Sequence, residues 1–303
     1  MTIKNINPIF FGTMILILLS SCHALVEDEF PDFIKTPVLN STLQADSTIK
    51  VQLSYTANLK DSVPYPIENG IVVIASTTVI DTLAYTKDGW YESSHTAKAG
   101  TAYTCEVTIP GCEKLSAEIY VPQPTPIENV IFTEVAGKDE YGENISSFRF
   151  SIRNDTMNDQ YWDVRMIEEG IHRRYNQEAK VWYDYFGSKQ QSIYMIAGQD
   201  SVLLNEANPL TIFSNKKIAG PTYDVCFYFS ERNTGFSPNY THYIEFRSVT
   251  KSYYEFKKQY YIYDTADIEQ VGSSAQNYSL YSNVKNGFGI FAGYSVSRFK
   301  IEF

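Results

Sequence analysis

An alternation of apolar and polar residues constrains this chain most, because its period of two is that of half-buried strands. Two clear examples run from Ile49 to Tyr55 and from Tyr103 to Ile109, where every second residue is apolar. Between residues 37 and 121 the pattern recurs in about seven short segments separated by turn signals. No helical period of useful length interrupts them. The pattern predicts an N-terminal β-sandwich of the immunoglobulin or transthyretin type.

The proline-rich stretch Pro122–Pro126 marks the clearest boundary in the chain. Its alternate prolines favour an extended, semi-rigid spacer. The 303 residues are also enough for two domains of ordinary size. We therefore predict a sandwich over 37–121, a linker over 122–126 and a second β-rich domain over 127–303.

The second half also alternates, but its period changes once. Aromatic residues recur every three to four positions over 250–263, which is the period of a helix. Gly287 and Gly289 then open a final pair of strands and would allow a bend or a close approach of strands. We expect a second β-sandwich or a partly open barrel with one packed helix, whose stripe of Tyr253, Tyr260 and Tyr263 packs on a sheet. Strands are predicted at 148–152, 162–166, 193–196, 202–204, 223–229 and 242–246.

A short apolar run near the start of the chain predicts export. Residues 9–19 are mostly apolar and follow Lys4. A membrane-spanning helix needs roughly 20 apolar residues, so a signal peptide over 1–21 fits this shorter run better. Leu19-Ser20-Ser21-Cys22 resembles a bacterial lipobox, in which the cysteine receives a diacylglycerol and the chain is cut before it. An ordinary secretory signal is the alternative.

An acidic segment follows the predicted lipidation site at Cys22. Glu27, Asp28 and Glu29 lie in a tether that we place at 22–36. Acidic residues this close to a lipidated cysteine resemble the export signal of Bacteroidota surface lipoproteins, although a solvated tether would look much the same. We expect an anchor in the outer membrane, with the protein facing outside the cell. The net charge of −10 disfavours nucleic acid as a partner.

The sequence holds no recognisable catalytic or metal-binding pattern, so we expect no enzyme and no cofactor. The histidines at 23, 95, 172 and 242 are far apart and match no zinc motif. The loop 154–159 is rich in Asn and Asp but lacks the spacing of a calcium-binding EF-hand. The carboxylates Glu168/Glu169 and Asp264/Asp267 are expected on solvated faces.

Two features leave alternatives open. Cys105 and Cys112 could form a disulfide across a hairpin turn, or the cysteines could pack as small buried residues. The second feature is a group of aromatic residues interspersed with charged ones. Rigid aromatic area of this kind suits a contact with a partner or a ligand, whereas the alternative is a lid over the second core. The aromatic group is Tyr175, Trp182, Tyr183, Tyr185 and Phe186, and the first four form the candidate contact surface.

Several short motifs recur along the chain in a characteristic order, and the strongest of them is the ending Ser282–Phe291. The others are the lipobox, Pro37–Asn40, Gly89–Tyr91, Gly100–Tyr103, the proline-rich join, Asn158–Trp162 and Ser252–Tyr254. Together they resemble a known family of Bacteroidota lipoproteins, catalogued as domain of unknown function 4249 (DUF4249), and the resemblance covers nearly the whole chain. It implies an outer-membrane lipoprotein, often encoded beside TonB-dependent transporters of the SusC type, and it supplies no catalytic residues.

Together these features predict a non-enzymatic surface lipoprotein that assists a TonB-dependent transporter or captures its ligand. A structural or adhesive surface protein built from β-sandwiches is the first alternative. A hydrolase acting on glycans or peptides through two carboxylates is the second, and it would require a cleft that brings such a pair together.

Overall fold

The structure, a computed structural model, describes residues 34–58, 63–191, 200–207, 209–230, 239–265 and 280–302. The predicted signal peptide, the lipobox with Cys22 and nearly all of the acidic tether lie outside these residues, as does the strand predicted at 193–196. Lys35–Phe303 form one compact unit, and the description below concerns that unit alone.

The N-terminal half is a β-sandwich, as the alternation predicts. One layer is a four-stranded sheet with the order β5-β4-β8-β9, and the other contains β1, β2 and β7. Alternate residues such as Leu53, Val72 and Val107 are fully buried between the layers. The strands are β1 (Pro37–Gln44), β2 (Thr48–Tyr55), β3 (Tyr65–Pro66), β4 (Ile71–Ala75), β5 (Ile80–Thr82), β6 (Ala84–Tyr85), β7 (Trp90–Thr96), β8 (Thr101–Thr108) and β9 (Leu115–Val121).

The C-terminal half forms a second sandwich around an aromatic core. A three-stranded sheet, β10-β11-β15, covers one face of β12 and β16. Trp162, Phe150 and Phe246 meet there without exposure to solvent. The elements are β10 (Ile127–Lys138), β11 (Asn144–Arg153), β12 (Tyr161–Asn176), β13 (Val181–Gln191), α2 (Ser201–Asn205), β14 (Ile212–Ser214), the 3₁₀ turn η1 (Asn215–Lys217), β15 (Thr222–Ser230), β16 (Thr241–Val249), α4 (Lys251–Thr265) and β17 (Phe288–Lys300).

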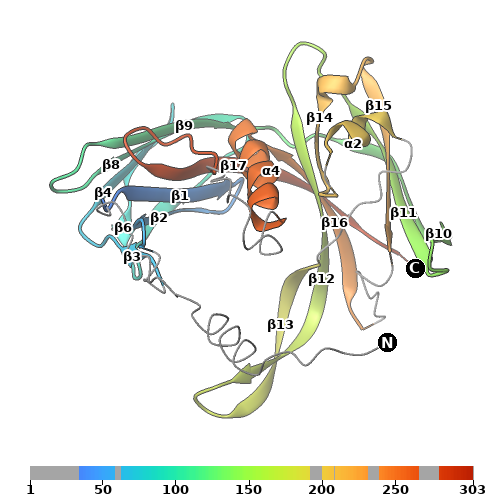
Figure 1. Ribbon diagram of the computed structural model, residues 1–303, viewed down its shortest axis with the longest axis horizontal. Coiled ribbons are helices and arrows are strands. Elements are labelled where there is room, and N and C mark those ends of the chain that lie inside the picture. The colour runs from blue at the N-terminus through green and yellow to red at the C-terminus, as the bar shows by residue number, and fades with distance from the viewer. Residues whose placement is uncertain are drawn as a thin grey trace, which may run out of the picture. The chain divides into compact units, whose positions relative to one another are not determined.

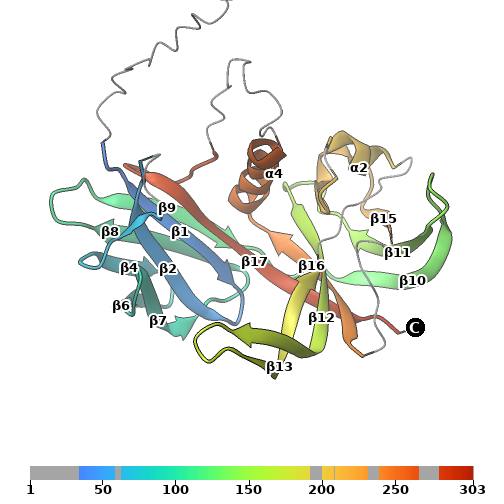
Figure 2. The ribbon, with the colours of Figure 1, turned by 60° about the horizontal axis from the view of Figure 1, so that its bottom comes forward.

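One sheet of ten strands runs through both halves. Its main path has the order β13-β12-β16-β17-β1-β2-β7-β6, and β17 joins the halves by pairing in parallel with β1 (Figure 1; Figure 2). Gly289 has a φ of +109° there, and a Cβ on it would overlap the Leu39 carbonyl oxygen. The predicted close approach of strands is therefore confirmed. Residues 122–126 separate two cores, whereas the sheet continues across both.

The predicted helix is confirmed as α4, which packs on the face of the large sheet opposite the second core (Figure 1). Thr250 caps its first turn by accepting a hydrogen bond from the Tyr253 amide at 3.2 Å. Tyr253 is buried beneath the helix, whereas Tyr260 and Tyr263 are 44% and 53% exposed. Of the predicted packing stripe, only its first residue is in the core.

The strand predicted at 202–204 is wrong, because these residues form the helix α2. The Asp200 carboxylate accepts hydrogen bonds from the amides of Val202 and Leu203, which is the geometry of a helix N-cap. A short apolar run has the same pattern in a buried strand and in a buried helix. The capping residue decides between them here.

Candidate functional site

A two-stranded ribbon extends beyond the large sheet and carries the predicted contact surface. β12 pairs with β16 only over Tyr161–Glu169, whereas its pairing with β13 continues to Asn176↔Val181. From Gly170 onward neither strand pairs with a third strand of the described chain, and the two project from the sheet (Figure 1). An isolated pair of strands is marginally stable in water, so this one depends on its turn and its base.

Both ends of the ribbon are fixed by specific contacts. At the turn, the Asn176 side chain accepts hydrogen bonds from the amides of Glu178 and Ala179, each at 2.9 Å. At the base, the His172 ring lies 3.1 Å from the Gly187 carbonyl oxygen and stacks on Tyr240 with the ring centres 5.0 Å apart. These contacts hold the ribbon in place from both ends.

The ribbon exposes large apolar side chains on both of its faces. Residues that are paired across an antiparallel ladder point to the same side, so the register assigns each residue to a face. Phe186 is 74% exposed, Ile171 65% and Trp182 60%. The first face holds Ile171, Arg173, Tyr175, Trp182, Asp184 and Phe186; the second holds His172, Arg174, Asn176, Val181, Tyr183 and Tyr185.

The structure brings together all four residues of the predicted contact surface, two on each face. Tyr175 contacts Trp182 with the ring centres 5.2 Å apart, and Tyr183 lies 6.2 Å from Tyr185. Arg173 lies 5.9 Å from the Trp182 ring centre and 3.7 Å from the Asp184 carboxylate. Phe186 belongs to the predicted aromatic group, whereas Ile171 was not predicted; the exposure of both makes them part of the same surface.

A buried network of charges lies between the sheet and α4. The fully buried Asp163 carboxylate is 2.7 Å from the Arg165 guanidinium and accepts a hydrogen bond from the Tyr253 hydroxyl at 2.7 Å. Arg247 forms an ion pair with Glu245 at 2.6 Å. Burial next to these groups lowers the pKa of Lys257 below its usual value. The charges hold the helix on the sheet, and nothing in the sequence pattern predicted them.

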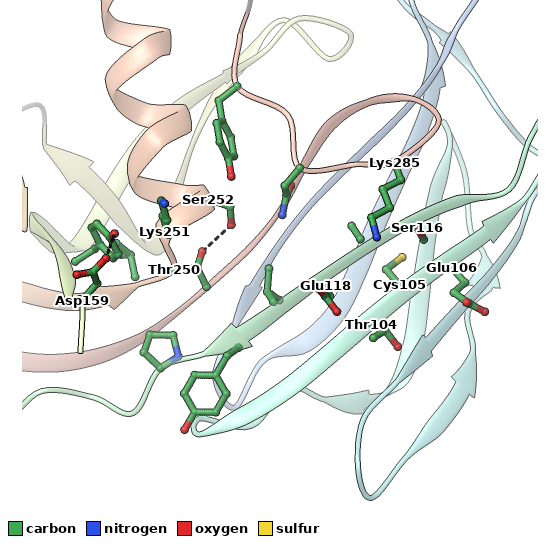
Figure 3. A pocket seen from close by; sticks show the side chains of 18 residues that line it. Thr104, Cys105, Glu106, Ser116, Glu118, Asp159, Thr250, Lys251, Ser252 and Lys285 are labelled. Carbon is green, nitrogen blue, oxygen red and sulfur yellow. Dashed lines mark hydrogen bonds between the residues drawn. The ribbon is translucent and has the colours of Figure 1, made fainter. Parts of the chain in front are cut away.

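A groove with a volume of about 720 Å³ lies beside β9 (Figure 3). One wall is the outer surface of β8 and β9, where Thr104, Ser116 and Glu118 lie. The other wall is the start of α4 together with residues 281–285. The groove holds both acidic and basic side chains, and it was not predicted from the sequence because its walls come from distant segments.

Of the carboxylates considered for hydrolysis, Glu168 and Glu169 are consecutive in β12 and therefore point to opposite faces of the strand. Both were expected on a solvated face, and this is wrong for Glu168, which is buried. Glu169 accepts a hydrogen bond from Ser188 that lowers the pKa of Glu169. Asp264 is exposed near the end of α4, and Asp267 lies outside the described residues. No metal-binding group of three or more His, Cys, Asp or Glu side chains occurs in the described ranges.

The loop 154–159 is held both by its own polar side chains and by Asn215 of η1. The Asp155 carboxylate accepts hydrogen bonds from the Met157 amide at 2.9 Å and from the Asn158 side chain at 2.7 Å. The side-chain Nδ2 of Asn215 donates hydrogen bonds to Asn154 Oδ1 and to the backbone carbonyl oxygens of Asp155 and Asn158, at 2.9–3.0 Å. Turn chemistry thus accounts for these residues. Cys105, Cys112 and Cys226 are free thiols in the structure, and burial raises the pKa of Cys105 to about 12. A disulfide between the first two is absent.

The chain was compared with known families, curated proteins and solved structures. The model of the family described as "Domain of unknown function (DUF4249)" matches residues 26–300. The chain belongs to this family. This match confirms the resemblance to DUF4249 that the motifs indicated. No curated protein matches the chain.

Among solved structures, the chain is similar to one from Bacteroides uniformis ATCC 8492, described as "a putative carbohydrate binding protein". The two chains are 8% identical, the match covers 88% of this DUF4249 chain and 98% of that protein, and the TM-score is 0.20. Neither helix in the described parts of the chain has the length and apolar run needed to cross a membrane.

Proposed function

We propose that this DUF4249 protein is a non-enzymatic binding protein, anchored by a lipid on Cys22 to the outer membrane and facing outside the cell. Its contact with a partner is made by the aromatic ribbon of β12 and β13. The observation that carries this proposal is the exposure of Trp182, Phe186 and Ile171 on a pair of strands that, beyond Glu169, no other strand of the described residues joins.

The composition of the ribbon supports binding to a protein. Exposed apolar patches on soluble domains are usually interaction sites, and Trp, Tyr and Arg are the residue types that dominate binding energy at interfaces. The ribbon carries all three types. Because its aromatic side chains have few rotatable bonds, ordering them in a complex costs little conformational entropy.

The proposed partner is a TonB-dependent transporter of the SusC type. This choice rests on the DUF4249 resemblance, which associates such lipoproteins with transporter genes. In this arrangement the lipid holds the protein beside the transporter, and the ribbon contacts the transporter's extracellular side. The protein would present a ligand to the transporter or stabilise that side of it.

The ribbon variant W182A/F186A tests the contact. The full chain is expressed in its native host, extracted in detergent and captured, and the co-purifying transporter is quantified by mass spectrometry. We expect the variant to lose at least about tenfold of the captured transporter, because each truncated aromatic anchor costs roughly 1–2 kcal/mol of binding. Y141A is the matched control, since Tyr141 is 73% exposed in the β10–β11 turn, away from the ribbon.

The outcomes separate the parts of the proposal. If the wild-type chain captures no transporter, the proposed partner is wrong. If W182A/F186A captures as much as Y141A, the ribbon is not the contact. Replacement of Cys22 by alanine tests the anchor: the variant should leave the outer-membrane fraction once unprocessed precursor is set aside, and its retention there would exclude lipidation at this residue.

A further inference from the structure

The strand β9 is the edge of its sheet, and one bridge already extends it. Ser116 exchanges two backbone hydrogen bonds with Lys285, at 2.8 and 3.4 Å, on the side of β9 that faces away from β8. In a strand, the backbone groups of residues two apart point the same way. Those of Glu118 and Tyr120 therefore point to the same outer side as those of Ser116.

Within the described residues, the backbone groups of Glu118 and Tyr120 have no partner on that side. Neither Glu118 nor Tyr120 makes a backbone hydrogen bond outward from β9 to any other part of the described chain. Together they offer two N–H donors and two carbonyl acceptors in a row. The row ends at Pro122, which has no N–H. The free edge therefore consists of the outward backbone groups of Glu118 and Tyr120, and it begins next to the Ser116–Lys285 bridge.

The groove lies along this free edge. Continuing the Ser116–Lys285 register would bring Asn283 opposite Glu118 and Tyr281 opposite Tyr120, yet those residues make no backbone pairing with β9. The Asn283 side chain instead exchanges hydrogen bonds with the backbone of Phe291. Segment 281–285 therefore diverges from β9 beyond the bridge, and the groove is the opening between them (Figure 3).

The charge of Glu118 determines which kind of strand is favoured at the free edge. The Glu118 carboxylate is exposed and has no ion pair or hydrogen bond in the described structure, whereas Glu106 is paired with Lys114 at 2.7 Å. Directly opposite charges on neighbouring strands stabilise a sheet, and like charges destabilise it. A strand added to this edge is favoured when it places a Lys or Arg beside Glu118.

We propose that the groove binds an extended peptide segment of a partner protein, which adds to β9 as a fifth strand of that sheet and places a basic side chain opposite Glu118. The backbone groups of Glu118 and Tyr120 supply affinity, and Glu118 supplies selectivity. The site is separate from the ribbon and does not depend on the function proposed above.

The test uses the full chain in detergent and three acetylated, amidated pentapeptides labelled with fluorescein. The first is Thr-Val-Lys-Val-Thr, the second has Glu in place of Lys, and the third is the Lys peptide with N-methyl groups on alternate amides of the edge that would pair. Binding is followed by anisotropy up to about 1 mM protein, the range of weak peptide complexes. Amide hydrogen exchange of the β9 segment is measured in parallel.

We expect the Lys peptide to bind about tenfold more tightly than the Glu peptide and to slow exchange at Glu118 and Tyr120. The N-methylated peptide should neither bind nor protect. E118K should reverse the preference, whereas E140K, a charge reversal at an exposed residue of the β10–β11 turn, should not. W182A/F186A should bind the Lys peptide like the wild type.

Three results with the peptides would overturn the inference. They are equal binding of the N-methylated and unmodified peptides, protection confined to segments other than β9, and absence of binding by any of the three peptides. Concentration-dependent protection of β9 without peptide would also overturn it, because a second copy of the chain would then be the occupant of the edge.

Discussion

The buried carboxylate of Asp163 helps to hold α4 against the sheet, because it accepts a hydrogen bond from the Tyr253 hydroxyl of the helix. It has no exposure to solvent and balances Arg165, whose side chain is 19% exposed. Replacing one partner of a buried ion pair leaves the other charge uncompensated, at a cost of about 3–5 kcal/mol. We therefore expect D163N to lower the free energy of unfolding in urea by several kcal/mol.

The matched control is E92Q, which removes the carboxylate of an ion pair with Lys50. Both side chains of that pair are well exposed, at 36% and 50%. Such a pair contributes under about 1 kcal/mol because solvent screens it. Equal losses from D163N and E92Q in the same urea titration would show that burial of Asp163 does not matter, contrary to this account.

At the scale of residues, the sequence predicted the exposure of the ribbon but not the burial of the charges beneath α4. Adjacent Trp182 and Tyr183 cannot both face one core in a strand, and this argument placed at least one of them in solvent. Both are exposed in the ribbon. By contrast, Asp163 and Arg247 occupy positions on β12 and β16 that alternation alone would leave facing solvent, and only the packing of α4 over them creates a buried network.

At the scale of elements, α4 begins at a cap that can be tested directly. The Thr250 hydroxyl accepts hydrogen bonds from the amides of Tyr253 and Gly293, both at 3.2 Å, and so joins the helix to β17. Loss of such a cap costs about 1 kcal/mol. We expect T250A to lose roughly 1–2 kcal/mol of unfolding free energy.

The conservative variant T250S keeps the hydroxyl and should recover most of that loss. Chemical denaturation monitored by circular dichroism gives both values. If T250S is as unstable as T250A, the loss comes from the methyl group of Thr250 and its packing rather than from the cap.

Element type was predictable where a segment was long and periodic, as for β8, β9 and α4. It failed for 202–204, where three apolar residues fit either a strand or a helix. The ribbon could not be foreseen as a free-standing pair, because the sequence does not say where β16 stops pairing with β12. The groove likewise needs the separation of segment 281–285 from β9, a tertiary feature with no local signal.

At the scale of the whole compact unit, the decisive contact joins the beginning of its fold to the end. The register of β1 and β17 runs from Val38↔Phe288 to Gln44↔Tyr294 in parallel. Parallel pairing between segments some 250 residues apart leaves no mark in local periodicity, so the sequence predicted two modules with a linker and could not predict the shared sheet. Phe291 of β17 lies in the first core and Ile301 near its end lies in the second.

Because one sheet passes through both cores, we expect them to unfold together. Two variants with a single tryptophan report on each half: Trp162 is buried in the second core, and Trp90 lies on β7 of the first sandwich. In each variant, the tryptophan fluorescence and the far-UV circular dichroism of the whole chain should follow coincident transitions in urea, as a single cooperative unit requires. Two separate midpoints would instead show that residues 122–126 link independent domains.

Gly289 provides the perturbation that makes this test sharp. G289A places a Cβ against the Leu39 carbonyl and should cost more than about 3 kcal/mol, since strain and a broken strand pairing add together. G111A is the control, because Gly111 also has a positive φ, +80°, but a Cβ there would meet nothing within 4 Å; its cost should stay near 1–2 kcal/mol. A shared sheet requires G289A to lower both tryptophan midpoints together. If the Trp162 transition keeps its wild-type midpoint while the Trp90 transition falls, the second sandwich does not need the β1–β17 pairing.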